Sequence, residues 1–71
     1  MGADMSERRY VRCQEIPQPG TQIVYNGYKG KVVCLERYTS WFTGPDTAVM
    51  EIRMFDGTKK SVLASRLGVL A

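Results

Sequence analysis

Basic and aromatic side chains alternate along much of the chain, and this pattern carries most of its chemical content. The 71 residues include ten Lys and Arg against seven Asp and Glu, a formal charge of +3. Cationic groups contact phosphates and aromatic rings stack on bases, so such interleaving is typical of surfaces that bind single-stranded nucleic acid. The candidate residues for such a surface are Tyr25, Tyr28, Lys29, Lys31, Arg37, Tyr38, Trp41, Arg53, Lys59 and Lys60.

A plainer interpretation of the same residues stays open. A charge of +3 is ordinary for a soluble domain, several tyrosines can lie half-buried in the fold, and Glu36 and Glu51 interrupt any basic stripe. Arg8, Arg9 and Arg12 add positive charge near the N-terminus. The arrangement of the cations in space therefore decides between the two interpretations.

The aromatic pair Trp41-Phe42 lies beside a Gly44-Pro45 turn, where small polar residues are usual. Neighbours in a strand point to opposite faces, so both rings cannot enter one core, and we expect at least one to be exposed. An exposed ring here is either an anchor for a protein partner or a lid over one end of the fold. Trp41 and Phe42 are thus the candidates for protein interaction.

Catalytic and metal chemistry have little support in these residues. The chain has no His, which is the commonest general base and metal ligand, and its serines therefore lack an activating partner. Cys13 and Cys34 are too far apart in sequence for a CxxC pair. We expect Cys34 to be a small buried hydrophobe, the pattern permits Cys13 to be exposed, and a disulfide between them is the minor alternative. The expectation is a non-enzymatic protein with no catalytic residue, metal, cofactor or small-molecule substrate.

Turn signals divide the chain into short β-strands. Asn26-Gly27, Gly44-Pro45-Asp46 and Asp56-Gly57 are turn sequences. The runs between and around them are rich in β-branched and aromatic residues and span 21–25, 31–38, 48–55 and 58–63. Residues 64–67 fit a single helical turn, after which 68–71 can return as a last strand. The pattern predicts an all-β meander.

The N-terminal residues differ from the rest. Pro17 and Pro19 favour an extended backbone, so residues 1–19 are expected to be a flexible or extended arm, within which 8–16 permit one short edge strand. The compact domain is expected to span 20–71. No apolar run approaches the roughly 18 residues of a membrane span, and the polar start lacks a signal sequence. These features predict a cytoplasmic protein without a membrane partner.

The hairpin at the Asp-Gly turn has two possible registers. A two-residue loop pairs Phe55 with Thr58, whereas a three-residue loop with a left-handed glycine pairs Met54 with Thr58. The three-residue loop buries more apolar area and is the register we predict. It also sets Arg53 directly beside Lys59, which is unfavourable unless an anion lies over the two cations.

The order of these elements resembles the SH3-like barrels, in particular their KOW and Tudor-like members. The resemblance covers residues 20–70 and rests on the stretches 19–25, 27–32, 55–57 and 65–67, with Gly30-Lys31-Val32 as the KOW-like step. It implies a small SH3-like barrel of about five short antiparallel strands, with one helical turn before the last strand. It also implies binding to nucleic acid or to a protein of the transcription machinery.

The layout is less closely similar to the type II dihydrofolate reductases, tiny barrels that build one active pore from four chains. The similarity lies in the placement of residues 48–51 and 64–67. That family's Val-Gln-Ile-Tyr segment is replaced here by Lys59-Lys60-Ser61-Val62, so no catalytic residue carries over. This resemblance implies only that such barrels assemble into homo-oligomers. The alternative hypothesis is therefore a protein-interaction or self-assembling module that uses the Trp41 loop and an exposed strand edge.

Overall fold

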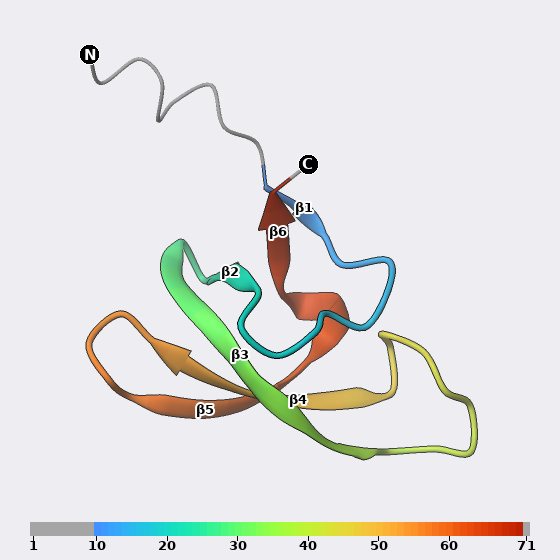
Figure 1. The fold of residues 1–71 in the computed structure, drawn as a ribbon. Helices are drawn as coiled ribbons and strands as arrows, with labels where there is room; N and C mark the ends of the chain where they lie inside the picture. Colours follow the sequence, from blue (N-terminus) through green and yellow to red (C-terminus); the bar gives the residue numbers. More distant parts are fainter. Residues whose placement is uncertain (1–9, 71) are drawn as a thin grey trace.

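The predicted all-β class is confirmed by a computed structural model, which describes residues 10–70. Six strands form one antiparallel sheet in the order β1-β6-β2-β3-β4-β5 (Figure 1). A single 3₁₀ turn, η1, precedes the last strand, as expected. The elements are β1 (Tyr10–Arg12), β2 (Gln22–Tyr25), β3 (Tyr28–Tyr38), β4 (Ala48–Met54), β5 (Lys59–Leu63), η1 (Ala64–Arg66) and β6 (Gly68–Leu70).

The sheet bends strongly but is not closed. β1 and β5 are its two edges, and no pairing joins them in the described part of the chain. In the described chain, the ladder between β2 and β6 consists of a single pair, Val24 with Gly68. Figure 1 shows β6 and β1 running steeply across the direction of β4 and β5. The strands therefore curl over a shared core without completing a barrel.

The first strand lies in the segment that the sequence assigns to an arm. Tyr10–Arg12 pair with β6, so the short edge strand that the pattern permits is present. The Cys13 backbone N–H then donates to the carbonyl of Leu67 at 3.0 Å. β1 thereby covers an edge of β6 that would otherwise be open. The expected flexibility of residues 1–9, with Arg8 and Arg9 among them, lies outside the described residues.

The β2–β3 and β4–β5 turns, called the hairpin turns below, have the backbone conformation that their sequences demand. Asn26 and Gly27 have positive φ angles of 52° and 83°, which is the type I′ geometry of a two-residue hairpin between β2 and β3. Gly57 has a φ of 90°, and Met54 N–H donates to the Thr58 carbonyl at 2.7 Å. The three-residue register is thus confirmed.

An Asx contact holds the second turn. The Asp56 carboxylate accepts from the Thr58 backbone N–H at 2.9 Å, and this hydrogen bond lowers the pKa of Asp56. The Gly44-Pro45 turn also forms, with Thr47 N–H donating to the Gly44 carbonyl at 3.1 Å. All three turn signals in the sequence are therefore turns in the structure.

Alternate residues of β4 supply the centre of the core. Met50 and Ile52 are fully buried and Met54 nearly so, as the predicted register requires. Opposite them, Gly30 lets β3 approach closely, because a Cβ at this position would lie 2.8 Å from the Arg53 carbonyl oxygen. The buried cluster consists of Cys13, Ile23, Val32, Ala48, Met50, Ile52, Met54, Ala64 and Leu67.

An irregularity in β3 changes the expected burial of Cys34. The register with β4 shifts between Val32 and Cys34, as in a β-bulge, and this turns Cys34 out of the core. Its thiol lies 3.8 Å from a carboxylate oxygen of Glu51 and is half-buried, whereas Cys13 is only 5% exposed. The expectation that Cys34 is buried was wrong, Cys13 is buried although the pattern permits it to be exposed, and both are free thiols. Burial raises the pKa of each thiol, and Glu51 raises that of Cys34 further.

We predict that Gly57→Ala destabilises the domain by about 1–2 kcal/mol, because alanine bears the steric cost of a left-handed backbone. Gly44→Ala is the matched control, because a Cβ added at either glycine would have no atom within 4 Å and only Gly57 has a positive φ. The control should change stability by less than about 0.5 kcal/mol. Urea unfolding measures both, and equal stabilities for the two variants would contradict the assigned turn.

Candidate functional site

Three cations lie in one row across the outer face of the sheet. In the strand registers, Lys31 of β3 faces Arg53 of β4, and Arg53 faces Lys59 of β5. All three are exposed. We call these residues the cationic row. Like charges directly opposite on neighbouring strands repel. Among residues 10–70, Glu51 is the one carboxylate that forms an ion pair with the row, at 3.8 Å from the Lys59 ammonium.

An open groove adjoins the cationic row. Lys29, Lys31 and Arg53 line it together with Gln22, Gly30, Met54 and Phe55, and its volume is about 290 Å³. Lys29, Lys31 and Arg53 form no ion pair with another described residue. The volume is at the lower end of the roughly 300–1,000 Å³ of small-molecule pockets. The groove is thus a shallow, mainly apolar surface bordered by three cations that have no ion-pair partner in the described chain.

Two exposed aromatic rings stand at the same end of the sheet. Tyr28 and Phe55 are 59% and 71% exposed, and their rings stack at a centroid distance of 5.9 Å and an interplanar angle of 15°. We call them the ring pair. The Phe55 N–H donates to the Lys29 carbonyl at 2.9 Å, which ties the ring to the cationic strand β3. Tyr25 and Lys60 line the adjoining depression, beside the ring pair.

Phe55 is a site residue that the sequence reasoning missed. A signal for it exists, because in the three-residue register Phe55 is the first loop residue and has no paired position in the strand. A large ring at such a position is left outside the core. The predicted turn could therefore have added Phe55 to the candidates.

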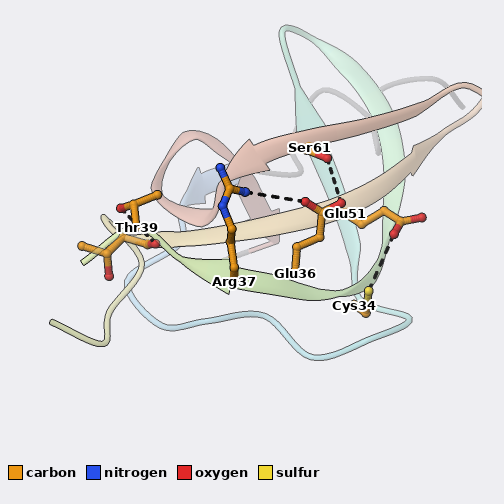
Figure 2. Close-up of polar contacts among 7 residues, drawn as sticks. Cys34, Glu36, Arg37, Thr39, Glu51 and Ser61 are labelled. Atoms are coloured by element: carbon orange, nitrogen blue, oxygen red, sulfur yellow. Dashed lines mark hydrogen bonds and ion pairs between the residues drawn. The ribbon is translucent and has the colours of Figure 1, made fainter. Parts of the chain in front are cut away.

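Acidic and neutral groups occupy the middle of the same outer face. Figure 2 shows Cys34, Glu36, Glu51 and Ser61 on neighbouring strands. The Ser61 hydroxyl donates to Glu36 at 2.9 Å, and the Arg37 guanidinium lies 3.9 Å from the same carboxylate. Glu36 and Glu51 do interrupt the basic surface, but they compensate only Arg37 and Lys59 directly. The cations without a carboxylate partner in the described chain, Lys29, Lys31 and Arg53, lie near the β2–β3 and β4–β5 turns.

Trp41 and Phe42 lie at the other end of the β3–β4 hairpin, in the loop between these strands (Figure 1). They are 84% and 63% exposed and stack at 4.3 Å between ring centroids. We call them the tip pair. The expectation that at least one is exposed is confirmed. Both are exposed because β3 ends at Tyr38, so the alternation of a strand does not apply to them.

The structure therefore divides the ten candidates into two groups. The group near the hairpin turns consists of Tyr25, Tyr28, Lys29, Lys31, Arg53, Lys59 and Lys60. The group near the β3–β4 loop consists of Arg37, Tyr38 and Trp41. The two groups lie toward opposite ends of β3, and Trp41 lies beyond the end at Tyr38, so it does not lie over the cationic row.

Comparisons with known protein families, with curated proteins and with solved structures found no match to this chain. In residues 10–70, no helix is long and apolar enough to cross a membrane. The same residues contain no group of three or more Cys, Asp or Glu side chains that could hold a metal ion.

We predict that Trp41→Ala leaves the free energy of unfolding within about 0.5 kcal/mol of the parent, because the ring supports no core contact. Leu67→Ala is the contrasting control, because Leu67 is fully buried and its truncation should cost about 2–5 kcal/mol. Thermal or urea unfolding compares the two. A Trp41→Ala variant that fails to fold would show that the indole belongs to the core.

Proposed function

We propose that the protein is a non-enzymatic binding module for single-stranded nucleic acid and that the cationic row and the ring pair form its interface. The observation that carries the proposal is the direct register of Lys31, Arg53 and Lys59 on three adjacent strands. Only Lys59 has a carboxylate neighbour in the described chain. Phosphodiester groups laid across these strands would supply the missing negative charge.

The ring pair supplies the second component of such an interface. Stacking of a base on an aromatic side chain contributes about 1–3 kcal/mol and is tolerant of sequence, because every base has a flat face. Tyr28 and Phe55 are exposed at the end of the groove that Lys29 and Arg53 line. Phosphate contacts and base stacking would therefore occur side by side.

Two further considerations support this class of function. The resemblance to KOW and Tudor-like barrels points to nucleic acid or to a protein of the transcription machinery, which would use the same basic surface. Both cysteines are free thiols, which suits the reducing cytoplasm where we expect the module to act.

A second candidate function rests on the tip pair. Trp41 and Phe42 present two stacked rings to solvent with no covering segment among residues 10–70. Exposed aromatics of this kind serve as anchors in protein interfaces. β1 and β5 are also open sheet edges, although Lys59 and Lys60 make β5 a poor edge for pairing. A protein partner or a second copy of the chain would use the opposite end of the hairpin from the nucleic acid.

We predict that the affinity for a labelled oligouridine falls steeply with salt, and that Lys31→Gln or Arg53→Gln makes the log–log slope shallower by about 0.7 each. Arg37→Gln is the matched control, because Arg37 also lies in β3 but its guanidinium is already 3.9 Å from the carboxylate of the preceding residue, Glu36. Its slope should equal that of the parent. Fluorescence anisotropy across a salt series gives the slopes.

Absence of binding at low salt, or an affinity that does not change with salt, would reject the nucleic-acid interface. Trp41→Ala separates the two candidate functions in the same assay. We expect it to keep both affinity and slope. A loss of affinity by about 1–3 kcal/mol with an unchanged slope would instead make Trp41 the stacking platform.

A further inference from the structure

A polar depression lies next to the proposed interface, at the start of β6. Its lining comes from β1, the end of β2 and the β2–β3 turn, the β3–β4 loop, the end of β5 and η1, and its volume is about 500 Å³. The lining residues are Arg12, Tyr25, Asn26, Asp46, Leu63, Ser65 and Arg66. We call it the arginine depression. Arg66 was not among the sequence candidates, because neither its neighbours nor its place in a helical turn indicates a partner.

The fold brings the two arginines together from distant parts of the chain. Arg12 pairs with Gly68 in the β1–β6 ladder, and Arg66 is the last residue of η1, two positions before that glycine. Both side chains are exposed, and within residues 10–70 neither forms an ion pair, with Asp46 or with any other carboxylate. The depression thus holds two uncompensated guanidinium groups, which suit bidentate contact with phosphate.

The arginine depression and the groove of the cationic row are linked by shared lining residues of a third depression between them. A middle depression of about 420 Å³ shares Met54 and Phe55 with that groove, and it shares Tyr25 and Asn26 with the arginine depression. Lys60 and the ring pair lie along the middle depression. Neighbouring depressions therefore lead from the cations of β3 and β4, past the aromatic rings and the Asp56 carboxylate, to a second group of cations.

We propose that one single-stranded nucleic acid follows this surface, with its bases against the ring pair and a phosphate beyond them held by Arg12 and Arg66. The inference rests on the proposed function and extends it from a local contact to a track of several nucleotides. Alternation of cations and rings matches the alternation of phosphates and bases along a single strand. Asp46 repels phosphate, so the phosphate lies on the side of the depression that the arginines form.

The test compares a short oligouridine of about four nucleotides with a longer one of about twelve. The parent should bind the longer strand more tightly and with a steeper salt slope, by about 0.7 for each added phosphate contact. Arg12→Gln/Arg66→Gln should bring the longer strand's affinity and slope close to those of the short strand. Binding of the short strand should not change.

Two controls isolate the charge of these arginines. Arg12→Lys/Arg66→Lys keeps both charges and should keep most of the slope, and Arg37→Gln removes an arginine outside the track and should have no effect. Circular dichroism verifies that each variant is folded. If the glutamine variant does not fold, the comparison of the two strands on the parent protein is the test. Equal salt slopes for the short and the longer strand would then overturn the proposed path along the three depressions.

The outcomes separate this inference from the proposed function. If the glutamine variant binds the longer strand as the parent does while Arg53→Gln weakens both strands, the track is rejected and the proposed interface stands. If neither strand binds the parent at low salt, the proposed function is rejected and the track with it.

Discussion

Burial of the inward side of β4 is the constraint on which the rest of the structure depends. Met50, Ile52 and Met54 fill the core, and each fully buried apolar side chain contributes about 1.5–3 kcal/mol. Their burial fixes the register with β3 and β5, and that register sets Arg53 between two lysines. A like-charge pair across strands costs only about 0.2–1 kcal/mol, so packing prevails and the repulsion remains. The apolar side of the sheet thereby determines the charge pattern of its outer side.

The outer face divides as a consequence. In its middle, Glu36 and Glu51 offset the nearest cations, and Ser61 completes a polar cluster. At the hairpin turns no described acid faces Lys29, Lys31 or Arg53, and the ring pair stands there as well. The tip pair is at the far end of the same hairpin (Figure 1). A single long hairpin therefore carries two chemically different surfaces, and each can be altered without changing the other.

Most of this fold could be predicted from local signals in the sequence. The features that could not be predicted depend on pairing between residues that are distant in the chain. The turns at Gly27, Pro45 and Gly57 depend on their own residues, and the register of β4 and β5 follows from apolar alternation. β1 was assigned to an arm, because its strand character depends on pairing with β6 at the other end of the chain. The bulge near Cys34 has no glycine or other local signal, so the sequence did not show that Cys34 points away from the core. The candidate site residues stay a prediction. The sequence did not show that Trp41 lies away from the cations, because this separation follows from where β3 ends.

The central claim is that uncompensated charge and exposed rings at the hairpin turns form one interface for single-stranded nucleic acid. Backbone amide chemical shifts, followed by NMR while an oligouridine is added, test it most directly in a chain of this size. The account predicts that shifts change in residues 28–31 and 53–60, while those of residues 39–43, the part of the β3–β4 loop that carries the tip pair, stay constant. Changes confined to the loop, or no changes at low salt, would contradict it.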